Sequence, residues 1–162
     1  MNNPKLHSVI KIAAALIFAQ LAGAIGALFT TPQTGVGTWY SVLNRSSLNP
    51  PNWIFGPVWT TLFLLMGYAS YLIWQTKKSL IRKWAIVLYI IQLALNTLWS
   101  ILFFGLHSPG AAVIEIVFLE AAIIACIVLF YKIKPVAAYL MLPYALWVAF
   151  ASYLNFMIWF LN

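Results

Sequence analysis

The 162-residue chain is 64% hydrophobic and only 7% charged, whereas soluble domains carry roughly 25% charged residues. Water is therefore excluded as the main solvent of the fold. The formal net charge of +7 does not indicate a nucleic-acid partner, because the nine cations stand at the ends of apolar segments and form no patch. The single cysteine, Cys126, lies inside an apolar segment, which excludes a disulfide framework and a thiolate metal site.

Five apolar segments, each long enough to cross a bilayer as a helix, occupy most of the chain. They predict an all-α, polytopic membrane protein, a five-transmembrane-helix bundle that forms a single domain over residues 1–162. The predicted helices are 9–29, 57–75, 82–105, 109–131 and 136–160. Prolines at positions 57, 109 and 135 fit the first turn of three of them, where a missing N–H breaks no hydrogen bond.

Small residues recur every four positions along the first segment, at Ala15, Ala19, Gly23 and Ala27. Such a stripe lets a second helix backbone approach closely, so it predicts helix packing, either within the chain or between chains. Cleavage as a signal peptide is not expected, because the apolar run continues past a normal signal-peptide core to Phe29.

Residues 30–56 form the longest connection, which is rich in aromatic residues, proline and glycine. Loops of this length between packed helices are often lids or binding segments. Its tryptophans also suit an aromatic belt at the membrane surface. One loop can serve as both, and we expect it to act as a lid.

Cations are distributed unevenly between the two ends of the predicted bundle. One end carries eight of them: Lys5, Lys11, Lys77, Lys78, Arg82, Lys83, Lys132 and Lys134. The other end carries only Arg45. The positive-inside rule therefore predicts an N-terminus inside and a C-terminus outside, as in a bacterial inner-membrane protein. The odd number of helices and the lack of an internal sequence repeat argue against a simple inverted-repeat transporter.

With this orientation, the polar and aromatic side chains of three helices fall in the outer half or the middle of the bundle, beneath the long loop. They are Trp59, Phe63, Gln92, Asn96, Trp99, Ser100, Tyr144, Trp147 and Asn155, and Ala151 lies on the same stripe as the last three. Their helical spacing within each segment puts them on shared faces, which predicts a pocket. Asn96 and Asn155 can equally be interhelical hydrogen-bond partners, and an aromatic stripe can equally be packing.

Two glutamates stand in the fourth segment, Glu115 in its outer half and Glu120 near its middle. An unpaired carboxylate in hydrocarbon is costly, so each should face the bundle interior or remain protonated, and we expect Glu115 to face protein. They lie about 140° apart around the helix, so they are not a catalytic carboxylate pair. His7 and His107 lie at or beyond helix ends with no second ligand, so neither a metal site nor haem ligation is expected.

Short motifs occur in a fixed order over residues 39–160, about three quarters of the chain. They are Trp39-Tyr40, Asn49-Pro50-Pro51-Asn52-Trp53, Gly56-Pro57-Val58-Trp59-Thr60, Met66-Gly67, Asn96-Thr97-Leu98-Trp99-Ser100, Phe103-Phe104-Gly105, Pro143-Tyr144, Trp147, Phe150-Ala151 and Leu154-Asn155. The ordered set resembles the TspO/translocator-protein family, also called tryptophan-rich sensory proteins or peripheral benzodiazepine receptors. The resemblance implies a usually dimeric five-helix bundle that binds porphyrins, such as protoporphyrin IX and haem, and benzodiazepine-type ligands.

The resemblance also implies a ligand cavity under the first loop. Together with the depth argument, it gives these candidate ligand-binding residues: Trp39, Arg45, Trp53, Trp59, Phe63, Asn96, Trp99, Tyr144, Trp147, Ala151 and Asn155. Arg45 is placed at the mouth, where it could meet a propionate. Sterol recognition at the C-terminus is not expected, because Phe156 and Phe160 replace the tyrosine and the cation of the mitochondrial sterol motif. Leu129, Tyr131 and Lys134 fit only a generic sterol pattern.

The leading hypothesis is a porphyrin-binding membrane protein, a homodimer with a sensory, regulatory or transport role and no required cofactor. One alternative is a light-dependent porphyrin-degrading enzyme, in which Trp59 and Trp147 would take part in electron transfer. The other alternative is a transporter of sterol or porphyrin. No residue separates the three, although the leading hypothesis involves no catalysis.

Overall fold

The computed structural model describes residues 4–162, with side chains from Leu6 onward, so the predicted inner cation Lys5 lies outside the described side chains. Within this range all regular structure is helical, and five helices are long and apolar enough to cross a membrane. These are α1 (Pro4–Thr30), α3 (Asn52–Trp74), α4 (Leu80–Ser100), α5 (Pro109–Ile133) and α6 (Pro135–Leu161). The predicted five-helix membrane fold is confirmed.

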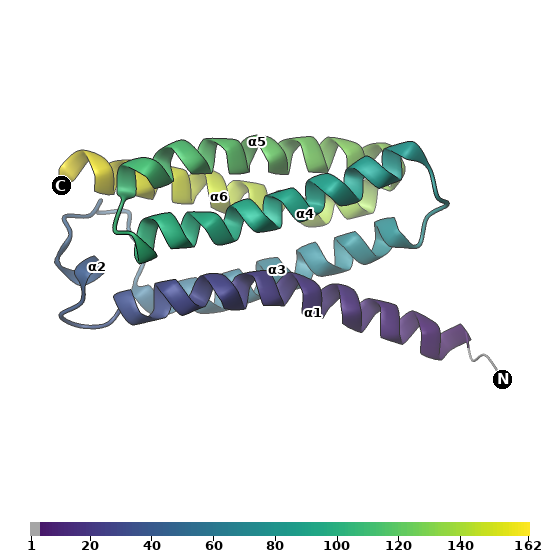
Figure 1. Ribbon diagram of the computed structural model, residues 1–162, viewed down its shortest axis with the longest axis horizontal. Helices are drawn as coiled ribbons and strands as arrows, with labels where there is room; N and C mark the ends of the chain where they lie inside the picture. The colour runs from purple at the N-terminus through teal and green to yellow at the C-terminus, as the bar shows by residue number, and fades with distance from the viewer. Residues whose placement is uncertain (1–3) are drawn as a thin grey trace.

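The five long helices close into a ring. Helix α1 packs on α3 and α4, α3 also packs on α6, and α5 lies between α4 and α6. The N-terminal half of α1 diverges from the other helices, as Figure 1 shows. The long loop and the C-terminus lie together at the opposite end of the bundle from the N-terminus (Figure 1).

The small-residue stripe of α1 packs within the chain, against α3. Ala19 is fully buried, and a Cβ added to Gly67 of α3 would lie 2.9 Å from the Cα of Leu16. Glycine is therefore required at position 67 for the two backbones to approach this closely. Ala27, the last member of the predicted stripe, is instead exposed. A four-residue spacing drifts about 40° per step on a helix of 3.6 residues per turn, so the packed face has moved by then to Gly26.

Helix α3 corrects the prediction made from Pro57. The helix begins five residues earlier, at Asn52, and Pro57 lies inside it. Pro51 precedes the first helical residue with an extended backbone (φ −56°, ψ 141°), so the helix can start directly after the two prolines. Pro57 has no N–H, so the Trp53 carbonyl lacks its usual helical donor.

Helix α4 continues into a π-helical turn, η2 (Ile101–Gly105), which the sequence pattern did not indicate. The N–H of Leu106 donates to the carbonyl of Ile101 at 2.8 Å, closing the wider turn. A π-turn changes the angular spacing of side chains. Consecutive residues Phe103 and Phe104 are both buried there.

The connection between α1 and α3 folds back over the end of the bundle (Figure 1). We call residues 31–51 the lid; it contains the 3-10 helix η1 (Thr31–Gln33) and the short helix α2 (Trp39–Val42). The Asn44 N–H donates to Oδ1 of Asn162, and Nδ2 of Asn162 donates to the Asn44 carbonyl, both at 3.0 Å. Hydroxyls of Ser46 and Tyr153 are 3.0 Å apart. Helix α6 thus holds the lid in place.

The distribution of cations between the two ends of the bundle allows the predicted membrane orientation to be tested. The α3–α4 and α5–α6 connections, together with the adjoining helix ends, carry six cations at one end, and Arg45 lies in the lid at the other. A tag after Asn162 should therefore be accessible only from outside the inner membrane, and a tag between Lys77 and Lys83 only from inside. Protease protection in oriented vesicles measures this, and the opposite labelling would reverse the predicted orientation.

Glu115 is buried in the protein, as predicted. Its carboxylate oxygens, however, have no hydrogen-bond partner among the described residues. Replacing a buried, unpartnered polar group by an apolar one of similar size removes a desolvation cost of roughly 1–3 kcal/mol. Glu115→Leu should therefore raise the unfolding temperature in detergent. Glu120 is the control, because it is half-buried and only its Oε2 is buried without a partner, so Glu120→Leu should have a smaller effect. A lower unfolding temperature for Glu115→Leu would reveal an unseen partner.

Candidate ligand cavity

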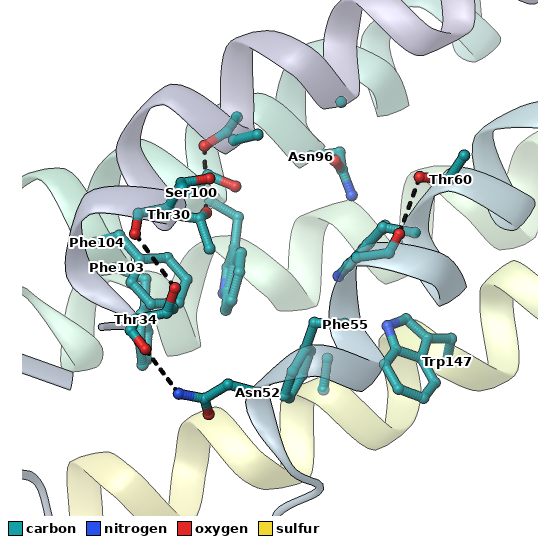
Figure 2. Close-up of a pocket in the computed structure, with 18 of the residues that line it drawn as sticks. Thr30, Thr34, Asn52, Phe55, Thr60, Asn96, Ser100, Phe103, Phe104 and Trp147 are labelled. Carbon is teal, nitrogen blue, oxygen red and sulfur yellow. Dashed lines mark hydrogen bonds between the residues drawn. The ribbon is translucent and has the colours of Figure 1, made fainter. Parts of the chain in front are cut away.

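A cavity of about 600 Å³ lies beneath the lid, enclosed by α1, α3, α4 and α6. Helix α5 contributes no residue to its lining. Pockets of roughly 300–1,000 Å³ suit drug-sized ligands. In Figure 2, Phe103 and Phe104 lie on one side of the cavity and Phe55 and Trp147 on the opposite side.

The walls of the cavity are aromatic. On α3, the rings of Trp59 and Phe63 lie 5.7 Å apart. The ring of Trp147 on α6 meets Phe55 edge-on at 5.9 Å. These rings offer flat apolar faces and edges, which suit a flat apolar ligand.

Helix α1 lines the cavity with very short side chains. A Cβ added to Gly23 would lie 2.4 Å from Phe63, and one added to Gly26 would lie 3.0 Å from the Ser100 hydroxyl. Ala24 and Ala27 complete this wall. The two glycines therefore let Phe63 and Ser100 pack directly against α1 at this wall of the cavity.

Two buried asparagines tie the helices together around the cavity. Nε1 of Trp99 donates to Oδ1 of Asn155, and Nδ2 of Asn155 donates to the Pro109 carbonyl, both at 2.9 Å. Nδ2 of Asn96 donates to the Tyr144 hydroxyl at 3.1 Å. Both asparagines are therefore interhelical hydrogen-bond partners, as one reading of the sequence predicted, and both also line the cavity.

Most of the residues predicted to bind ligand line this one cavity. They are Trp53, Trp59, Phe63, Asn96, Trp99, Trp147, Ala151 and Asn155. Trp53 stands at the opening, with 74% of its surface exposed. The structure thus brings these residues together at one cavity, as their depth and helical spacing predicted, while ligand contact by each remains a prediction.

The structure places three of the predicted residues outside the cavity lining. Trp39 turns away, and its ring stacks on His107 with the centroids 4.3 Å apart. Tyr144 is fully buried behind Trp59, so it supports the wall. Arg45 lies in the lid, with its guanidinium 5.0 Å from the centre of the Tyr40 ring.

Sequence reasoning missed another part of the lining. Its members are Tyr40, Phe55, Phe103, Phe104, Leu154 and Ile158. Leu154 and Ile158 had a usable signal, because they extend the α6 face that carries Ala151 and Asn155. Phe103 and Phe104 enter through the π-helical turn, for which the sequence has no periodic signal.

A polar depression adjoins the cavity and shares Asn52 and Trp53 with it. Arg45 lies in this depression, and its Nη1 is 3.5 Å from Oδ1 of Asn52. The only two acidic residues of the chain, Glu115 and Glu120, are both in α5 and none is in the lid. Arg45 is therefore a cation at the cavity mouth without an acidic neighbour in the lid.

The cavity is suited to binding more than to acid–base chemistry. Among the described residues that line it, Tyr40 is the only one with an ionisable side chain. The remaining polar lining consists of amides, hydroxyls and indole N–H groups. These features define a multi-pass membrane protein with a ligand-sized aromatic cavity under a lid.

Comparison with known proteins identifies the family. The family model described as TspO/MBR family matches residues 13–160. A tryptophan-rich protein TspO from Archaeoglobus fulgidus is 39% identical over 158 residues, covering 96% of this chain and 99% of the relative. The Homo sapiens translocator protein is 42% identical over 124 residues, covering 75% of this chain and 73% of the relative. A tryptophan-rich sensory protein from Cereibacter sphaeroides is 35% identical over 118 residues, 73% of each.

The chain therefore belongs to the TspO/MBR family, as the ordered motifs indicated.

Proposed function

We propose that this protein binds porphyrins, such as protoporphyrin IX or haem, in the cavity beneath the lid and has a sensory, regulatory or transport role. The observation that carries the proposal is the cavity itself, with about 600 Å³ enclosed by indole and phenyl rings. A porphyrin is a flat aromatic macrocycle, so its faces complement these rings. The relatives' names, which include translocator and sensory proteins, agree with such a role.

Arg45 gives the proposed ligand an orientation. Protoporphyrin and haem carry their carboxylates on one edge of a macrocycle that is otherwise apolar. The depression that holds Arg45 adjoins the cavity and shares Asn52 and Trp53 with it. The carboxylates would lie at Arg45 in the lid while the macrocycle enters the aromatic cavity.

Absorbance of protoporphyrin with the purified protein, in the dark and under illumination, tests the proposal against its alternatives. Stable, shifted bands in both conditions support binding. Loss of the bands only in light, with a new product, supports the degrading enzyme, for which Trp59 and Trp147 are the candidate redox residues. Movement of protoporphyrin across a proteoliposome membrane supports the transporter. No shift in either condition, at saturating protoporphyrin, would exclude porphyrin as the ligand.

Arg45→Gln should weaken the binding of protoporphyrin about threefold to tenfold, because an exposed charge-assisted contact is worth about 1 kcal/mol. The dimethyl ester of protoporphyrin, which lacks the negative charges, should lose little affinity from the same substitution. Titration of both ligands against both proteins measures the difference. An equal loss for the two ligands would show that Arg45 does not recognise the carboxylates.

We also propose a homodimer in a bacterial inner membrane, with the N-terminus inside. The resemblance supports the dimer and the cation distribution supports the orientation. Sterol is not proposed as a ligand, because Phe156 and Phe160 replace the polar residues of the mitochondrial sterol motif.

A further inference from the structure

A ligand that enters the cavity from the side must pass between two neighbouring helices, along the line of contact that we call a seam. Residues of α6 close two of these seams. Between α3 and α6, the rings of Phe55 and Trp147 meet edge-on, with centroids 5.9 Å apart. Between α4 and α6, the hydrogen bond from Trp99 to Asn155 bridges the two helices at 2.9 Å. A ligand cannot pass either seam without displacing these groups.

The seam between α1 and α4 is closed by α4 hydroxyl side chains that pack against the α1 backbone. The Thr97 hydroxyl donates to the Ala22 carbonyl at 3.2 Å. One helical turn further along α1, Gly26 lies so close to Ser100 that an added Cβ would be 3.0 Å from its hydroxyl.

The seam between α1 and α3 is different, because the exposed members of the cavity lining lie on its two sides and in the adjoining start of the lid. They are Ala24, Ala27, Thr31, Asn52, Trp53, Gly56 and Thr60. Lining residues from α4, η2 and α6 are all buried or half-buried. The cavity therefore opens to the surface along the α1–α3 seam.

Two hydrogen bonds mark the ends of this opening. At the end nearer the middle of the bundle, Nε2 of Gln20 donates to the Thr60 carbonyl at 2.9 Å. At the lid end, Nδ2 of Asn52 donates to the Thr34 carbonyl at 2.8 Å, a bond drawn in Figure 2. Between them, a Cβ added to Gly56 would meet no atom within 4 Å.

We propose that the gap framed by these two bonds is a lateral window through which a flat apolar ligand passes directly between the membrane and the cavity. Both helices that frame the window are apolar enough to span the bilayer, so the window faces lipid. A ligand dissolved in the membrane then needs no path through the lid. Gln20 limits the width of the window, because its side chain holds α1 to α3. The identity of the passing ligand rests on the proposed function, whereas the window itself does not.

A tryptophan at position 56 should obstruct the window without crowding the fold, since the space beside Gly56 is open. In proteoliposomes with protoporphyrin added through the lipid, Gly56→Trp should slow both association and dissociation at least tenfold. Val36→Trp, at a fully exposed position of the lid, is the matched control and should change neither rate more than twofold. Gln20→Leu, which removes the restraining bond, should accelerate both rates severalfold.

Unchanged rates in Gly56→Trp, or equal slowing in Val36→Trp, would overturn the window. Slower association with unchanged dissociation would also overturn it, because the new indole would then be filling the site and not its entrance. A nitroxide at Gly56→Cys, in a Cys126→Ala background, tests the window without any ligand. Collisions with lipid-soluble oxygen should exceed those with a water-soluble nickel complex, and the reverse would place the opening in water. If the unsubstituted protein fails to bind protoporphyrin, the proposed function fails, and the nitroxide result alone decides the window.

Discussion

Trp59→Ala and Trp147→Ala should each weaken protoporphyrin binding at least tenfold. Both indoles line the cavity, one from α3 and the other from α6. An aromatic contact contributes about 0.5–1.5 kcal/mol beyond simple burial. Loss of buried apolar area adds about 25 cal/mol per Å². The two terms together exceed the roughly 1.4 kcal/mol that corresponds to a tenfold change in Kd.

Trp74 and Trp84 provide matched controls for this experiment. Both are exposed, at 46% and 53%, and both flank the α3–α4 connection at the end of the bundle opposite the lid. Their alanine variants should bind protoporphyrin with nearly unchanged affinity. Quenching of tryptophan fluorescence, titrated across the four variants, gives the Kd values. Equal losses at all four positions would indicate general destabilisation, and losses confined to Trp74 and Trp84 would move the site to the other end.

The helices and much of the cavity were predictable because each depends on a regular pattern. The lengths of the apolar segments are enough to identify five membrane-spanning helices. Alternating direction then assigns a depth to every residue, and helical spacing assigns a face. Segment length, depth and helix face together predict that Trp59, Asn96 and Trp147 lie near one another, and all three line the cavity.

Positions outside regular helices were not predictable by the same means. The direction of Trp39 depends on His107, which lies in a different connection and has a left-handed backbone (φ 50°). No local pattern in the lid encodes that contact. Within helices, the mispredicted positions are those where the spacing of side chains departs from the regular repeat that the sequence analysis assumed. Ala27 leaves the packed face because a four-residue spacing drifts, and Phe103 with Phe104 enters the cavity through a change of helical pitch.

Gly67→Val should separate α1 from α3 and cause a large loss of stability. A Cβ at position 67 would lie 2.9 Å from the Cα of Leu16 and 3.0 Å from the Ala15 carbonyl oxygen. These are backbone atoms, so no side chain can rotate to make room. Overpacking typically costs 1–3 kcal/mol, and a rigid contact should place this variant at about the upper limit. Gly67→Ala should be milder, since the helix propensity of alanine offsets about 1 kcal/mol of the strain.

Gly56→Ala distinguishes this effect from a general intolerance of glycine substitution in α3. Its Cβ would occupy open space, so the variant should be neutral or more stable by about 0.5–1 kcal/mol, the usual gain for alanine over glycine in a helix. Thermal unfolding in detergent, followed by circular dichroism, should rank the proteins in the order Gly56→Ala, unsubstituted, Gly67→Ala, Gly67→Val. Gly67→Val should also lose protoporphyrin binding, because the same helix α1 that packs on Gly67 forms one wall of the cavity. An unfolding temperature equal to that of the unsubstituted protein would show that α1 does not pack against α3 at this position.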